Sequence, residues 1–279
     1  MLRVISDYFF RKKEQNSVAF KKPYYSEMED FVPNSCFIPN EGSESWHSPV
    51  MISAKSIAKS ASSIATLNTS IKLLQTISRD EYSNYVLSYY HEGIKRFCEN
   101  WYFLDIVNVI IALSDTLQPR RYLEVGVRCG RSACAVASAA PSCDMFLFDM
   151  WVEDYSGMRN PGPDFVRSEL KKVGHQGRSH FINGDSHKTL PVFLDCNPSL
   201  SFDLITVDGD HSPEGAAQDL RDALPRLAIG GAVVFDDICH PAHPGLKDVW
   251  NQMVCMDPRY SCHNYIDTGF GVGFAIRKS

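Results

Sequence analysis

The sequence predicts an α/β fold: a doubly wound, mostly parallel sheet with a C-terminal antiparallel hairpin, preceded by a mainly helical N-terminal region. Three observations predict it. Short apolar runs alternate with helical stretches from Arg121 onward, a glycine-rich turn follows the first run, and two strand-like runs stand close together near the C-terminus. Alternating strands and helices favour a parallel sheet with helices on both faces. A length of 279 residues fits one large domain with an appendage.

The N-terminal region is expected to span residues 1–95, and the main domain residues 96–279. Residues 1–50 mix aromatics, prolines and charges without periodicity, which is typical of an arm or extended cover. Residues 51–80 predict a helix with a narrow apolar stripe. The stripe consists of Ile57, Ile64, Leu67, Ile71 and Leu74. Two interpretations remain open: the stripe packs against another subunit in a homo-oligomer, or it packs on its own domain.

The segment 81–117 is predicted to form two helices. The second of them, WYFLDIVNVIIALSDTL, is apolar on nearly all sides, so we expect it to be buried, and Pro119 ends it. Short apolar runs then predict five strands. They lie at 122–125, 145–148, 180–182, 204–207 and 232–235, with a helix at 213–227. The hairpin is predicted at the sheet edge, from runs at 263–266 and 272–276.

Composition and charge exclude several classes of protein. Apolar residues make up 44% and charged residues 22% of the chain, as in an ordinary globular protein. The net charge of −5 argues against nucleic-acid binding, because phosphate neutralisation needs clustered Lys and Arg. No window reaches the ~20 apolar residues of a membrane span, and the N-terminus lacks a secretory-signal pattern. Nine cysteines without CxxC spacing fit reduced thiols, so we expect a cytoplasmic protein.

The glycine-rich turn follows the first predicted strand in the sequence EVGVRCGRS. Gly126 and Gly130 allow the backbone to approach a ligand closely at the carboxyl end of the strand. The spacing is GxxxG, and Arg128 stands where a pyrophosphate would press on the backbone, which argues against NAD. Glu124 would repel a phosphate and suits a cationic cofactor. Ser132 is expected to help cap the following helix.

Acidic residues end the next strands. Asp149, at the end of the second strand, is placed to accept hydrogen bonds from ribose hydroxyls. Asp185, after the third, is a candidate for the amino group of an adenine. A strand-end Asp is also a common helix N-cap, so each residue alone is a weak signal. The ordered set of glycine turn and two acids is more specific.

The fourth and fifth strands end in VDGDH and FDD. Asp208, Asp236 and Asp237 are expected to converge there, because these strands are expected to be neighbours. Three close carboxylates repel one another, and a hard cation such as Mg²⁺ relieves that repulsion.

Five segments in this order resemble class I S-adenosylmethionine-dependent methyltransferases, and among them the metal-dependent sugar O-methyltransferases of macrolide biosynthesis (macrocin and mycinamicin type) and related cephalosporin-hydroxylase-like sequences. They are EVGVRCGRSA, FLFD, NGDS, LITVDGDH and GGAVVFDD. The resemblance covers about residues 100–279 and implies a Rossmann-like fold, S-adenosylmethionine as cofactor and Mg²⁺ held by Asp208, Asp236 and Asp237. Some relatives have Glu at the position of Asp236, which keeps an oxygen ligand but changes how far the carboxylate reaches.

His211 is the expected general base, since the resemblance implies that role and a neutral imidazole near a substrate hydroxyl can take its proton. Alternatively, the His211 side chain caps the following helix. His240 is the second candidate for base or substrate contact and His243 a weaker one. Asp210 is more typical of a solvated or capping acid than of a fourth ligand, and Cys129, without a base nearby, is interpreted as a small filler.

These residues predict an O-methyltransferase acting on a hydroxyl of a small molecule. The expected substrate is a sugar of a natural product, a glycan residue or a catechol-like diol. One alternative keeps the cofactor fold without metal or methyl transfer, and another is a scaffold protein that assembles through the apolar stripe. The segment 151–165, rich in Gly and Pro, is predicted to be a mobile lid over the substrate, or else an ordinary surface loop.

Overall fold

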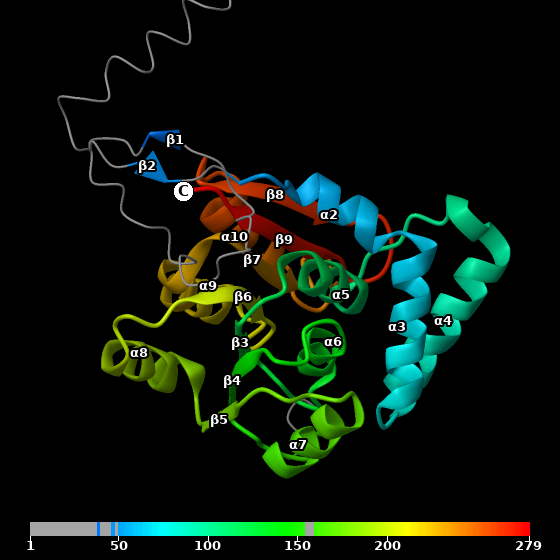
Figure 1. Ribbon diagram of the computed structural model, residues 1–279, viewed down its shortest axis with the longest axis horizontal. Helices are drawn as coiled ribbons and strands as arrows, with labels where there is room; N and C mark the ends of the chain where they lie inside the picture. Colours follow the sequence, from blue (N-terminus) through cyan, green and yellow to red (C-terminus); the bar gives the residue numbers. More distant parts are fainter. Residues whose placement is uncertain (1–37, 40–45, 48–49, 154–158) are drawn as a thin grey trace, which may run out of the picture.

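The computed structural model describes residues 38–39, 46–47, 50–153 and 159–279 (Figure 1). The strands are β1 (Ile38–Pro39), β2 (Trp46–His47), β3 (Arg121–Val125), β4 (Asp144–Asp149), β5 (Ser179–Asn183), β6 (Phe202–Val207), β7 (Leu227–Asp236), β8 (Tyr260–Tyr265) and β9 (Val272–Arg277). The helices are α2 (Ala54–Ala61), α3 (Ile64–Thr76), α4 (Glu81–Phe97), α5 (Ile106–Leu117), α6 (Arg131–Ala139), α7 (Pro163–Lys172), α8 (Ser186–Cys196), α9 (Pro213–Ala223) and α10 (Leu246–Trp250). A π-helical turn, Asn251–Cys255, follows α10.

The main sheet has the strand order β5-β4-β3-β6-β7-β9-β8. Its first five strands are parallel, and β9 pairs antiparallel with both β7 and β8. This arrangement confirms the predicted Rossmann-like sheet and its C-terminal hairpin. The order reverses at β3 and β6, which are neighbours although far apart in sequence, and ligands in open α/β sheets bind at such a reversal.

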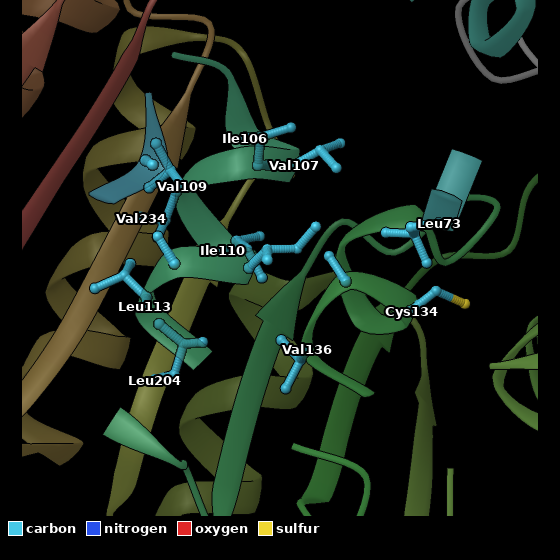
Figure 2. Close-up of a cluster of buried hydrophobic side chains, with 14 of the residues drawn as sticks. Leu73, Ile106, Val107, Val109, Ile110, Leu113, Cys134, Val136, Leu204 and Val234 are labelled. Atoms are coloured by element: carbon cyan, nitrogen blue, oxygen red, sulfur yellow. The ribbon is translucent and has the colours of Figure 1, made fainter. Parts of the chain in front are cut away.

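Alternate residues of each strand pack into two separate cores, as the period of two in a strand requires. Tyr122 faces the core formed with α2–α7, while Leu123 faces the core formed with α8–α10. Figure 2 shows the first core, where side chains of α5 lie between α6 and the strand residues Leu204 and Val234. The second helix of the segment 81–117 is buried, as predicted from its all-round apolar sequence.

The predicted single helix over 51–80 is two helices. It breaks at Ser62 and Ser63, because the Ser63 side chain accepts a hydrogen bond from the Thr66 N–H and so caps α3. The apolar stripe is buried in the chain's own first core, where α2 and α3 contact α5. This confirms the second interpretation of the stripe, and oligomerisation stays a prediction.

Cys255 and Cys262 form a disulfide, with their Cα atoms 5.3 Å apart, which corrects the expectation that all the cysteines are reduced thiols. The pairing depends on the π-helical turn lying beside β8, and linear spacing carries no sign of that. The predicted arm falls mostly outside the described residues. Within the described part of the chain, every helix is too short or too polar to cross a membrane.

Candidate cofactor and metal site

The glycine turn and the acidic loop after β6 are in backbone contact at the reversal of strand order. Gly126 has a φ of +87°, and a Cβ there would lie 1.9 Å from the carbonyl oxygen of Asp208. The N–H of Asp208 in turn donates to the carbonyl of Val125 at 2.9 Å. Only glycine fits position 126, so the glycine turn and the loop that carries the acids are held in direct contact.

A small cavity lies above this turn. It is bounded by the turn, the start of α6 and the link between α3 and α4, and its volume is about 60 Å³. The lining includes Gly126, Arg131, Ser132, Asp208 and Asp80. That volume is far below the ~300–1,000 Å³ of typical ligand pockets. The cavity therefore suits one end of a cofactor, not a whole nucleoside.

The N-terminal helices supply one wall of this cavity, which the sequence did not indicate. Asp80 caps α4 and forms an ion pair with the Arg128 guanidinium at 3.2 Å. The Nε of Arg128 also donates to the carbonyl of Arg159 at 3.2 Å. Arg128, with a φ of +49°, thus links the glycine turn to two other segments.

Glu124 is buried beneath the turn. Burial, and then the negative charge of Asp208, hold the pKa of its carboxyl well above the usual range. Its Oε2 has no hydrogen bond of normal geometry within the described structure, although Tyr122 and Ser132 lie near the carboxyl group. A buried acceptor without a partner fits an ammonium group, whose N–H groups are donors.

Asp149 holds the glycine turn in place. Its Oδ2 accepts from the N–H groups of Val127 and Arg128, both at 2.8 Å. Its Oδ1 accepts from the Trp151 N–H at 2.7 Å and from Asn160 Nδ2 at 2.9 Å. The ribose role predicted for Asp149 stays a prediction, because a ribose would have to replace some of these four donors.

Asp185 is the N-cap of α8, where it accepts from the His187 N–H at 3.1 Å. Its hydrogen bond with Lys188, at 3.0 Å, lowers the pKa of its carboxyl. The side chain keeps 36% of its surface exposed, so a ligand at this edge can reach it. The adenine role is untested and stays a prediction.

The three acids at the ends of β6 and β7 act on one another electrostatically. Burial and then the charges of Asp237 and Asp208 hold the pKa of Asp236 well above its usual range. Burial and then the charge of Asp208 raise the pKa of Asp237 to about 7. Asp237 also has a φ of +59°, a strained conformation for a residue other than glycine. This is the repulsion that the sequence predicted.

Histidines complete the cluster. His211 Nε2 lies 3.2 Å from Asp208 Oδ1, and its Nδ1 lies 3.9 Å from Asp237 Oδ2. The hydrogen bond with Asp208 raises the pKa of the imidazole. The His243 ring is centred 4.5 Å from that of His211 and 4.6 Å from that of His240. Sequence reasoning placed His243 last, whereas the structure places it against His211.

One set of three possible metal ligands has atoms within 4.8 Å of one another in the described part of the chain: His211, Asp237 and His243. Asp208 and Asp236 are not members of this set. The structure therefore brings Asp237 and His211 together as expected, and adds His243, the weaker of the candidate histidines in the sequence.

Arg131 is a cation that the sequence analysis missed beside these acids. Its guanidinium lies 4.9 Å from the centre of the Tyr82 ring, and its buried Nε has no hydrogen-bond partner within the described structure. Burial lowers the pKa of Arg131, but neighbouring acidic groups, including Asp236 and Asp208, raise it overall. Arg131 lies within the glycine motif, directly after Gly130.

The remaining candidates from the sequence are Asp210, Cys129 and the segment 151–165. Asp210 accepts from the Ser212 N–H at 2.8 Å, while the N-cap of α9 is Ser212 and not Asp210. The Sγ of Cys129 lies 3.7 Å from the carbonyl of Arg159, and burial raises the pKa of the thiol, so it is a poor nucleophile. In the segment 151–165, residues 154–158 lie outside the described structure, and the lid stays a prediction.

Comparisons with known proteins bear on the fold. A family model described as "Methyltransferase domain" matches residues 123–238. A curated relative, the uncharacterized protein y4gI of Sinorhizobium fredii, is 26% identical over 149 residues, which are 52% of this chain and only 16% of that protein's length.

Two solved structures are similar to this chain. An O-methyltransferase from Bacillus cereus in complex with SAH has a TM-score of 0.50 at 15% identity, covering 77% of this chain and 91% of its own. TomG, an O-methyltransferase from Streptomyces achromogenes in complex with SAM, has a TM-score of 0.49 at 21% identity, covering 73% and 92%. Residues 123–238 therefore match the model of a methyltransferase domain, and they lie on a Rossmann-like sheet.

Proposed function

We propose that the chain is an S-adenosylmethionine-dependent O-methyltransferase, assisted by Mg²⁺, that acts on a hydroxyl of a small molecule. One observation carries the proposal. The glycine turn at Gly126 touches the backbone of Asp208, and the Asp208 side chain in turn contacts His211. A cradle for a methyl donor and a group able to take a proton are thus held side by side, which alignment of the two reactants needs.

The residues around the turn fit S-adenosylmethionine, which supplies an electrophilic methyl group when bound. Glu124 and Ser132 would hold the amino-acid end, because the cavity at the start of α6 is small, polar and next to a buried carboxyl without a full set of partners. Asp149 would meet the ribose after exchanging some of its present donors, and Asp185 the adenine. Gly126 and Gly130 would allow close approach.

A divalent cation would relieve the repulsion that, together with burial, raises the pKa values of Asp236 and Asp237. Asp208, Asp236 and Asp237 would hold Mg²⁺, an ion that prefers oxygen ligands and would make a bound hydroxyl more acidic. The set His211, Asp237 and His243 offers two nitrogens, which suit Zn²⁺ or Mn²⁺ better. Occupation of that second set would remove His211 as a base.

His211 is the proposed base. When its Nε2–H donates to Asp208 Oδ1, at 3.2 Å, Nδ1 keeps its lone pair and is the atom that accepts the substrate proton. Asp208 fixes that tautomer and orients the ring. Arg131, held against Tyr82, adds a positive charge near the acids and limits their repulsion.

The acceptor is proposed to present two adjacent hydroxyls, as in a sugar of a natural product, a glycan residue or a catechol-like diol. No nucleic-acid or membrane partner is proposed; a cytoplasmic location and a homo-oligomer through the N-terminal helices remain sequence-based proposals. The second candidate function keeps the cofactor but is independent of metal or catalyses another reaction. The absence of Asp208 and Asp236 from the mutually close ligand set is the observation in its favour.

The test is transfer of a labelled methyl group from S-adenosylmethionine to a panel of vicinal diols, with Mg²⁺ or with EDTA. Asp208→Ala and Asp237→Ala are expected to abolish turnover while S-adenosylhomocysteine binding stays measurable by calorimetry. Asp195→Asn, an exposed change on α8, is the matched control. Full turnover in EDTA would refute the metal role, and cofactor binding without methylated product from any acceptor would favour the second candidate.

A further inference from the structure

A carboxylate outside the proposed machinery is fully buried between α8 and α9. Asp219, on α9, has no exposed surface. Its Oδ1 accepts from the Ser186 hydroxyl at 2.7 Å and lies 3.5 Å from His187 Nε2. Ser186 and His187 begin α8, directly after Asp185. Asp219 is thus tied to the segment that presents the residue proposed for the adenine.

The other oxygen of Asp219 lies under the acidic loop. A Cβ on Gly209 would be 3.1 Å from Asp219 Oδ2 and 2.8 Å from Val125 Cγ1, so the loop backbone rests directly on both. The N–H of Asp210 stabilises the ionised form of Asp219, although Oδ2 has no hydrogen bond of normal geometry within the described structure. The loop that holds Asp208 and His211 therefore packs directly on the Asp219 carboxylate.

A second residue on the same helix face makes the same pair of contacts. Gly215 precedes Asp219 by four residues, so both lie on one side of α9. The carbonyl of Gly215 lies 3.2 Å from His187 Nε2. A Cβ on Gly215 would be 2.0 Å from Asp210 Oδ2. One face of α9 therefore touches the start of α8 and the acidic loop together.

We propose that Asp219 is a positioning residue that couples the segment at Asp185 to the loop Asp208–His211, so that the adenine end of the cofactor and the proton-accepting end of the site keep a fixed relation. The proposal rests on the proposed function. Burying a carboxylate costs free energy unless polar groups interact with it. Here those groups come from two separate loops.

The experiment compares Asp219→Ala, Asp219→Asn and Ser186→Ala, with Asp222→Asn on the same helix as the matched control. The readouts are the Kd for S-adenosylhomocysteine by calorimetry and kcat at saturating cofactor. Asp219→Ala is expected to weaken binding about tenfold and to lower kcat, since it frees both loops. Asp219→Asn keeps an acceptor for Ser186 and is expected to stay within about twofold of the parent protein, as is the control.

A double-mutant cycle separates coupling from packing. Ser186→Ala is expected to weaken binding, and adding it to Asp219→Ala to cost little more, because both changes remove one hydrogen bond. A purely structural role would lower the Tm and leave the Kd of the folded protein unchanged, and that result would overturn the inference. If Asp219→Ala does not fold, an unchanged Kd in Ser186→Ala is the overturning result. Failure of the unmodified protein to bind S-adenosylhomocysteine would instead refute the proposed function.

Discussion

The substitution Gly126→Ala tests whether the glycine turn and the acidic loop form one unit. Alanine in the left-handed region costs about 1–2 kcal/mol wherever it occurs. At position 126 the added Cβ would also lie 1.9 Å from the Asp208 carbonyl oxygen, against the 3.4 Å at which ordinary contact begins. The two backbone segments must therefore separate by about 1.5 Å. Overpacking of this kind adds about 1–3 kcal/mol.

Gly174→Ala is the matched control, because Gly174 has a φ of +83°, close to the +87° of Gly126, with nothing within 4 Å of its Cβ position. Thermal unfolding is expected to place the Tm of Gly126→Ala about 2–5 °C below that of Gly174→Ala. Binding of S-adenosylhomocysteine, measured by calorimetry, is expected to weaken in Gly126→Ala only. Equal Tm values and equal affinities in the two variants would refute the claim that backbone contact joins the turn to the loop.

Three further predictions use the same measurements. Asp149→Ala leaves the N–H groups of Val127, Arg128 and Trp151 without their acceptor, so the Tm falls by an amount equivalent to about 2–4 kcal/mol; an unchanged Tm would count against its role as anchor of the turn. Leu67→Ala costs about 2–5 kcal/mol with a Tm shift that is independent of protein concentration, since Leu67 is buried in its own chain; a concentration-dependent shift would point to a subunit interface. Burial raises the pKa of Asp219 to about 6, against the attraction of His187 and with the repulsion of Asp210, so ionised Asp219 destabilises the fold as pH rises through about 6. The Tm of Asp219→Asn relative to the parent protein should therefore increase between pH 5 and pH 8, and a constant difference would contradict this.

Periodicity and strand ends made the fold predictable from the sequence. The five parallel strands and the hairpin stand where the apolar runs predicted them, because buried strands need such runs. The apolar stripe that includes Ile57 and Leu67 did not show what it packs against, because a helix pattern shows which face is buried and not what covers it. The break between α2 and α3 depends on the N-cap at Ser63, which the polar composition of the segment did not reveal.

The site was predictable only as far as strand ends define it. Asp208, His211 and Asp237 are near one another because β6 and β7 are neighbours in the sheet. Asp80 and Arg131 were not predicted as site residues, because their positions depend on how helices from a distant part of the chain cover the turn. The four donors on Asp149 and the pairing of Cys255 with Cys262 likewise depend on tertiary placement.

The rim of the sheet at Gly126 is proposed to hold a sulfonium donor beside a base. Calorimetric titration of the full chain with S-adenosylhomocysteine tests this arrangement. Saturable binding is expected, preserved in Gly174→Ala and weakened in Gly126→Ala. An absence of binding at millimolar ligand, in a protein that unfolds cooperatively and is therefore folded, would contradict it.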